Sequence, residues 1–284
     1  MIFEHEIPAG SRLYFGESAR VKRKIEQIAS EILEREGFEE IVTPLFSYHQ
    51  HQSIRDNKEL IRISDPQNRE VTLRADSTID VVRLVTKRLG RTTAQKKWFY
   101  IQPVYRYPTN EINQIGAEWL DGKLSDVLDV TMSIFKELGI SPVLQISNIQ
   151  IPVIISLEFG IPLEWFACMQ IEKLLGTEYK WLENLVRVQT LDQLDSVIQN
   201  VPEVLRPELE KMRELKQSIH YEHTVLAPLY YAKMRYYDGL FFQCFKNNTP
   251  LASGGHFNND EILAAGFALY TDALIEHIRN MNFV

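Results

Sequence analysis

The chain has 284 residues, of which 45% are hydrophobic, and its net charge is −7. That length supports one large domain or two small ones with a sizeable core. The charge gives no bulk electrostatic case for a nucleic-acid partner, no apolar run approaches the roughly 20 residues of a membrane span, and the N-terminus shows no secretory signal.

Predicted helices and strands alternate along the first 150 residues. Hydrophobic spacing and turn residues indicate, in chain order, a helix at 17–37, a strand from 38 that ends near Pro44, a strand at 70–74, a helix at 79–89, a hairpin of strands at 98–106 and 114–120, a helix at 124–138 and a strand at 142–147. Asp76 or Ser77 is placed to cap the second of these helices.

The middle of the chain, from about Leu157 to Gln217, has a different pattern, because charged residues alternate with Leu, Val and Ile at helical spacing. Strand patterns resume at 236–245 and 266–270, and a last helix follows at 271–281. We predict an α+β fold, with helices packed on a mostly antiparallel sheet. In this division the core comprises 1–156 and 220–284, and 157–219 is a helical insertion.

Cysteines and histidines predict neither a metal site nor a redox centre. Cys168 and Cys244 are far apart and match no metal-binding or redox spacing. His220 and His223 lie at a helix-like spacing, but no third ligand accompanies them. We therefore expect no cofactor, no metal and a reduced, cytoplasmic setting.

The predicted strand QIGAEWL (114–120) places Gln114, Gly116 and Glu118 on one face and apolar residues on the other. A carboxylate on a covered face needs a partner, and Gly116 leaves room for a close approach to the backbone. One interpretation is therefore a polar ligand pocket built on the sheet. The other is a face open to solvent, which antiparallel sheets often have, and this stretch alone favours it.

Two further clusters each allow a functional and an ordinary interpretation. At the junction TLRADST (72–78), Asp76 could hold a ligand amine while Thr78 binds its carboxylate, or Asp76 could be only an N-cap. In RYYDGLFFQ (235–243) only one of the adjacent tyrosines can line a pocket. The following ASGGHFN (252–258) suggests a tight turn with close backbone approach.

Taken in order, these motifs resemble the class II aminoacyl-tRNA synthetases, and the histidyl enzyme most closely. The N-terminal segment and motif 1 of that family resemble IPAGSR, the long helix and GFEEIVTPLF, and motif 2 resembles YIQPVYRYP. Motif 3 resembles AAGFALYTDA. Four shorter family segments also have counterparts: Leu-Arg-Pro-Glu-x-Thr in TLRADST, Gln-x-Gly-x-Glu in QIGAE, the Tyr-Tyr segment in RYYDGLFF, and Gly-Gly-Arg-Tyr-Asp in SGGHFN. The resemblance covers nearly the whole chain and implies that fold. It assigns the amino-acid pocket to Asp76, Thr78, Gln114, Glu118 and Tyr237, and the arginine on the ATP α-phosphate to Arg106.

The ATP site departs from the synthetase pattern. Ala273 stands where motif 3 supplies an arginine, Pro108 where motif 2 has a glutamate, and Ala232 where the histidine-activating arginine is expected. The short loop before Gln114 contains no Arg or Lys, although a synthetase needs cationic groups on the ATP phosphates. No anticodon-binding domain is expected after motif 3. We therefore predict no catalysis from this chain.

A kept amino-acid pocket with a lost ATP site is similar to the regulatory subunit of short-form ATP phosphoribosyltransferase, the first enzyme of histidine biosynthesis. The resemblance implies assembly with the short catalytic subunit, typically as a hetero-octamer, together with activation of that subunit and feedback inhibition by L-histidine. It also implies a self-dimer through residues 20–46. No nucleic-acid or membrane partner is expected.

The segments YYDG and GGHFN depart from the Tyr-Tyr-Thr-Gly and Gly-Gly-Arg-Tyr-Asp of that family. Two locations for histidine therefore stay open, namely the synthetase-like pocket and the contact with the catalytic subunit. Two other functions also stay open. One is a truncated histidyl-tRNA synthetase-like enzyme that activates an amino acid, and the other is a scaffold that binds no small ligand.

Overall fold

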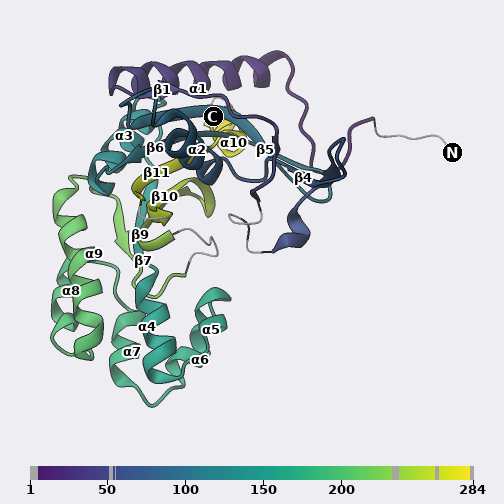
Figure 1. Cartoon of the computed structure of the whole chain (residues 1–284). Helices are drawn as coiled ribbons and strands as arrows, with labels where there is room; N and C mark the ends of the chain where they lie inside the picture. The colour runs from purple at the N-terminus through teal and green to yellow at the C-terminus, as the bar shows by residue number, and fades with distance from the viewer. Residues whose placement is uncertain (1–5, 51–53, 55, 232–236, 260–261, 282–284) are drawn as a thin grey trace.

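The computed structural model describes residues 6–50, 54, 56–231, 237–259 and 262–281. An eight-stranded sheet runs through the molecule (Figure 1) in the order β1-β5-β6-β11-β10-β9-β7-β8. The pairs β1–β5 and β7–β8 are parallel, and the other neighbours are antiparallel. These strands are β1 (Glu39–Glu40), β5 (Lys97–Arg106), β6 (Asn110–Leu120), β7 (Val143–Asn148), β8 (Thr224–Leu226), β9 (Tyr237–Lys246), β10 (Thr249–Asn259) and β11 (Ile262–Tyr270). The predicted α+β fold with a mostly antiparallel sheet is confirmed.

Three helices pack on one face of this sheet, namely α1 (Gly16–Arg35), α3 (Leu124–Glu137) and α10 (Thr271–Met281). Alternate strand residues such as Ile115 and Phe267 join Ile25 and Leu33 of α1 in one buried cluster. The long first helix is confirmed, and the chain turns out of it at Gly37, whose φ is +82°. That left-handed conformation favours glycine.

The opposite face of the sheet carries polar residues and is covered at one end by α2 (Thr78–Leu84) and the π-helical turn η3 (Val85–Leu89). Val81 and Val85 of this helical unit pack on Trp98 and Tyr100 of β5. A small sheet in the order β2-β4-β3 leads into α2. Its elements are β2 (Phe46–Ser47), the connecting η2 (Asn57–Glu59), β3 (Arg62–Ser64) and β4 (Glu70–Leu73).

Helices follow β7 along the chain and lie at the β7–β8 end of the main sheet (Figure 1). They are α4 (Gln150–Phe159), α5 (Leu163–Ala167), α6 (Ile171–Leu175), α7 (Lys180–Val186), α8 (Leu191–Ile198), η4 (Glu203–Leu205) and α9 (Arg206–Ser218). Buried residues such as Leu182, Leu194 and Leu209 belong to the same hydrophobic cluster as the sheet. None of the described helices combines the length and the apolar character needed to cross a membrane.

Three local predictions differ from the structure. The strand expected from 38 to near Pro44 is only two residues long, at β1, and the chain leaves the main sheet after Ile41, whose N–H still donates to the carbonyl oxygen of Phe99. The second hairpin strand begins at Asn110 rather than Gln114, since Arg106 and Asn110 are direct partners across the hairpin. The glycines of GGHFN lie inside β10, and the turn is instead at Asn247 and Asn248, which both have positive φ.

One buried arginine joins these parts. Arg74, after β4, donates from Nε and Nη2 to the carbonyl oxygen of Pro103 at 3.0 and 2.8 Å. Its Nη1 donates to the carbonyl oxygens of Thr43 at 2.9 Å and Pro44 at 3.3 Å. Arg74 thus satisfies backbone groups in the irregular segment that replaces the expected strand, and fastens that segment to β5.

We expect Arg74→Met to lower the free energy of unfolding by about 3 kcal/mol, because buried carbonyl groups lose their donors. Arg69→Met is the matched control, since Arg69 is exposed and pairs with Asp65 at the surface; its effect should be much smaller. Urea denaturation of both variants measures the difference. Equal losses would show that Arg74 does not fasten the segment.

Candidate functional site

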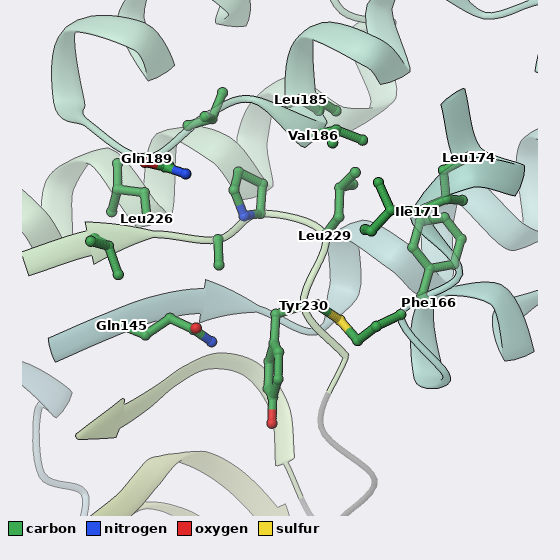
Figure 2. Close-up of a pocket in the computed structure, with 15 residues that line it drawn as sticks. Gln145, Phe166, Ile171, Leu174, Leu185, Val186, Gln189, Leu226, Leu229 and Tyr230 are labelled. Atoms are coloured by element: carbon green, nitrogen blue, oxygen red, sulfur yellow. The ribbon is translucent and has the colours of Figure 1, made fainter. Parts of the chain in front are cut away.

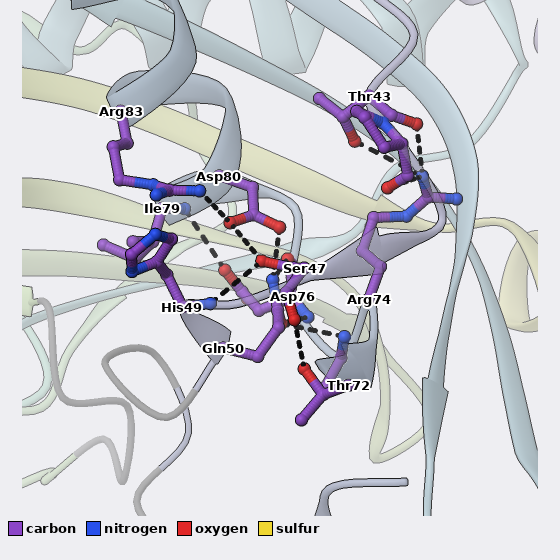
Figure 3. Close-up of polar contacts among 12 residues, drawn as sticks. Thr43, Ser47, His49, Gln50, Thr72, Arg74, Asp76, Ile79, Asp80 and Arg83 are labelled. Atoms are coloured by element: carbon purple, nitrogen blue, oxygen red, sulfur yellow. Dashed lines mark hydrogen bonds and ion pairs between the residues drawn. The ribbon is translucent and has the colours of Figure 1, made fainter. Parts of the chain in front are cut away.

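Two of the predicted site residues lie at the strand–helix junction 74–78, and Figure 3 shows one of them, Asp76, among its polar contacts. Asp76 and Thr78 are both buried. The N-cap position of α2 is Ser77, and the Asp76 carboxylate, one residue earlier, accepts a 3.4 Å hydrogen bond from the N–H of Ile79 in the first turn. Ser77 makes no capping bond, because its hydroxyl accepts from Gln102 Nε2 at 2.9 Å.

Glu118 lies beneath this junction and is 1% exposed. The interpretation of this face as open to solvent is therefore wrong at Glu118. Neither carboxylate oxygen has a hydrogen bond of good geometry within the described part of the chain. Burial raises the pKa of Glu118 well above its usual value, and the nearby charge of Asp76 raises it further, while the hydroxyls of Thr78 and Tyr100 lower it. Asp76, Thr78 and Glu118 are thus brought together.

Two glycines shape the space around Glu118. A Cβ at Gly266 would lie 1.9 Å from Glu118 Oε2, so only glycine lets the carboxylate lie across β11. A Cβ at Gly116 would lie 2.2 Å from the hydroxyl oxygen of Tyr100. The close approach predicted at Gly116 is therefore present, but the approaching group is Tyr100, its partner on β5.

Tyr100 connects the cluster to Tyr237. Its pKa is raised well above the usual value by burial and then by the charges of Glu118 and Asp76, and Tyr237 also raises it. The Tyr237 ring meets Phe241 edge-on at a centroid distance of 5.0 Å. Tyr237 is thus on the same side of the sheet as Glu118.

Gln114 lies on the same face but further along β6, opposite Gln102 and Tyr270 in the neighbouring strands. Four residues along a strand correspond to about 13 Å, so Gln114 does not touch the Glu118 carboxylate. Its amide is half-buried and has no hydrogen-bond partner among the residues that the structure describes. Of the five predicted pocket residues, Gln114 is the one set apart.

Arg106 lies at the end of β5 away from Glu118, in a surface pocket of about 640 Å³, and its Nε donates to the carbonyl oxygen of Ala75 at 3.3 Å. Its Nη1 pairs with Glu59 at 3.3 Å. In the same pocket Arg12 pairs with Glu276 at 3.6 Å. The pocket is also lined by Glu111, Asp272 and Ala273. Both arginines are therefore neutralised, and the remaining carboxylates make the pocket acidic. Ala232 lies outside the described residues.

The apolar cavity of Figure 2, about 270 Å³ in volume, is elsewhere. It lies between the helices after β7 and the segment 225–230, and Phe166, Leu174 and Tyr230 are among its walls. None of the predicted site residues lines it. The Tyr230 ring stacks on Phe241 at a centroid distance of 5.7 Å, and Phe241 also contacts Tyr237. Phe241 therefore lies between this cavity and Tyr237.

Comparison with known proteins identifies the family. A sequence model of histidyl-tRNA synthetase matches residues 13–162, more than half of the chain. The ATP phosphoribosyltransferase regulatory subunit of Wolinella succinogenes is 50% identical over 99% of both chains. That of Helicobacter hepaticus is 43% identical over 97% of this chain and 99% of its own. This chain belongs to the family of ATP phosphoribosyltransferase regulatory subunits.

The fold of this regulatory-subunit family member also matches solved structures. An ATP phosphoribosyltransferase regulatory subunit/histidyl-tRNA synthetase from Bacillus halodurans C superposes with a TM-score of 0.86 at 22% identity, covering 98% of this chain and 84% of that one. A histidine–tRNA ligase subunit from Alicyclobacillus acidocaldarius has a TM-score of 0.81 at 18% identity, covering 99% of both chains. The predicted synthetase-like fold is confirmed.

Sequence reasoning missed several residues around the regulatory subunit's polar cluster. Tyr100 and Gly266 reach Glu118 only through the register of β5 and β11 with β6, which no local pattern specifies. Gln50 contacts the junction from a segment without regular periodicity. The one available signal was strand parity, which places Tyr100 on the same face of the predicted hairpin as Gln102, although parity does not show that Tyr100 reaches Glu118.

We expect Glu118→Gln to stabilise the protein relative to the wild type increasingly as the pH rises above about 5, by about 1.4 kcal/mol for each pH unit up to the folded-state pKa, because the amide cannot ionise in its buried position. The folded-state pKa of Glu118 lies above its ordinary value of 4.5. The folded state therefore binds more protons than the unfolded state above that pH, and wild-type stability falls as pH rises.

Urea denaturation at several pH values measures this difference, with the exposed Glu183→Gln as control. If the curves of free energy against pH for the wild type and Glu118→Gln are parallel, the carboxyl of Glu118 titrates as an ordinary exposed group.

Proposed function

We propose that this chain is the non-catalytic regulatory subunit of a short-form ATP phosphoribosyltransferase, and that it binds L-histidine beside Glu118. The observation that carries the regulatory role is the 50% identity with a named regulatory subunit over 99% of both chains. The pocket is supported by the juxtaposition of Asp76, Thr78 and Glu118. In this proposal the chain transmits feedback inhibition by histidine to a catalytic partner.

The charge of the cluster favours a cationic ligand. The Glu118 carboxyl is buried without an aligned donor among the described residues, beside the negative Asp76. A ligand with an ammonium or imidazolium group beside Glu118 would favour the ionised form of this carboxyl, because a nearby positive charge lowers the pKa of a carboxyl group. In this proposal Asp76 and Glu118 divide the α-amino group and imidazole between them, Thr78 and Gln114 face the carboxylate, and Tyr237 lines the imidazole.

The Arg106 pocket supports the absence of catalysis. ATP-dependent activation requires cations at the phosphates, since negative charge must be stabilised in the transition state. Here Arg106 and Arg12 are each paired with a glutamate, and Glu111 and Asp272 add further acidic groups. A polyphosphate would meet an acidic surface. The histidyl-tRNA synthetase-like enzyme is therefore the weaker alternative.

The partners follow from the regulatory role. We propose a cytoplasmic hetero-octamer with the short catalytic subunit, in which this chain dimerises through residues 20–46. Val42, in that segment, is 77% exposed, and the adjacent Phe46 is 54% exposed. Apolar side chains this exposed are typical of contact surfaces when they occur together. The division into a core of 1–156 and 220–284 with a helical unit at 157–219 is also part of this proposal.

The proposed control is thermodynamic linkage. Histidine would bind one state of the complex more tightly than the other, and the favoured state would be the less active one. Activation and inhibition would then depend on different parts of the chain. Activation would require the contact with the catalytic subunit, whereas inhibition would require the cluster at Glu118.

We expect the wild-type chain to co-purify with a short catalytic subunit and to raise its phosphoribosyltransferase activity, and we expect histidine to inhibit that complex. Asp76→Asn and Glu118→Gln should keep the activation but raise the histidine concentration for half-inhibition by about tenfold or more, since each removes a charge-assisted contact. The control variant is Glu183→Gln, because the Glu183 side chain is exposed on α7 and pairs with Arg187 at the surface.

Unchanged inhibition in both pocket variants would locate histidine at the contact with the catalytic subunit. Activation without any histidine binding would indicate a scaffold. Histidine-dependent exchange of pyrophosphate into ATP by the chain alone would contradict the non-catalytic role.

A further inference from the structure

Gln50 is a fully buried polar residue at the end of the segment 46–50, with 0% of its surface exposed. Its Oε1 accepts from the backbone N–H groups of Ala75 at 2.8 Å and Asp76 at 2.7 Å. Its Nε2 donates to the carbonyl oxygen of Asp76 at 2.9 Å and to Asp80 Oδ2 at 2.6 Å. One side-chain amide therefore makes four hydrogen bonds, three of them to the backbone at 75–76 (Figure 3).

The backbone at 75–76 depends on these bonds because it lies between two regular elements. Strand β4 ends at Leu73 and α2 begins at Thr78. The N–H groups at Ala75 and Asp76 therefore have neither a strand ladder nor a helix to pair with, and buried backbone donors must be paired. The side-chain amide of Gln50 supplies the hydrogen-bond acceptor and donor that the backbone of a neighbouring strand would otherwise supply.

Asp80 fixes Gln50 in turn. Its Oδ2 accepts from Gln50, and its Oδ1 accepts from the Ser47 hydroxyl at 3.0 Å. Asp80 lies in the first turn of α2, four residues after Asp76, so the contacts close a ring from Asp76 through Gln50 to Asp80 and back along the chain. A carboxylate acceptor also strengthens the bond from Gln50. Rotation of Gln50 or of the junction would break several bonds together.

We propose that Gln50 is a positioning residue for the effector pocket. It holds Asp76 and the first turn of α2, with Thr78, in the orientation in which both face Glu118. Gln50 bonds the backbone of Asp76 and none of the side-chain groups that are proposed to bind histidine, so it acts through the position of Asp76. This inference rests on the proposed histidine site.

The test uses full-length variants and titration with L-histidine. Gln50→Asn keeps the amide but shortens the side chain by one methylene, so it cannot reach the backbone at 75–76 and Asp80 together. We expect its dissociation constant for histidine to rise about tenfold, the size of effect typical when a supporting contact behind a ligand-binding group is lost. In the Asp76→Asn background the same change should have little further effect, because both act through one group.

Thr72→Val is the matched control. The Thr72 hydroxyl is buried in the same layer and donates to the carbonyl oxygen of Ser47 at 3.1 Å, but it does not contact the backbone at 75–76. We expect this variant to lose stability and to bind histidine as the wild type does. Thermal unfolding of each variant reports how much stability is lost.

The outcomes separate the two proposals. Wild-type affinity in Gln50→Asn, or equal loss of affinity in Gln50→Asn and Thr72→Val, would overturn the positioning role while leaving the histidine site intact. Full additivity with Asp76→Asn would also overturn it. Absence of histidine binding by the wild-type protein would overturn the proposed site, and this inference with it.

Discussion

Burial of the Glu118 carboxyl is the constraint around which the polar face of the sheet is organised. Removing a carboxylate from water costs several kcal/mol, and the hydroxyls of Thr78 and Tyr100 near it offset only part of that cost, since neither makes a hydrogen bond of good geometry to it. The protein instead raises the pKa of this group. Gly266 and Gly116 make space for the arrangement, because side chains there would collide with Glu118 and Tyr100. The proposed cationic ligand would lie beside this carboxyl.

The two ends of the same face differ in chemistry. At one end Glu118 and Asp76 are buried beneath α2. At the other, Arg106 is paired with Glu59 in an acidic surface pocket. In a synthetase-like fold the second end would have to attract phosphates, and here the charge opposes that. This difference in charge is what the proposed regulatory role rests on at the level of the site.

Patterns local in sequence predicted much of this arrangement. The 3.6-residue spacing identified the long first helix, and strand parity placed Gln114 and Glu118 on one face, as observed. Contacts between segments distant in sequence could not be predicted from these patterns. Tyr100 meets Gly116 only through the hairpin register, and Gln50 lies in an irregular segment whose position Arg74 fixes by bonds to backbone carbonyls. Neither propensity nor periodicity encodes such contacts.

The most direct test of the account is calorimetric titration of L-histidine into the full chain, comparing the wild type with Glu118→Gln. If Glu118 is the buried acceptor for a cationic ligand, the wild type binds histidine, and the variant binds at least about tenfold more weakly, a difference of about 1.4 kcal/mol. Equal affinity in the two proteins would contradict the account, because the buried carboxylate would then have no part in recognising the effector.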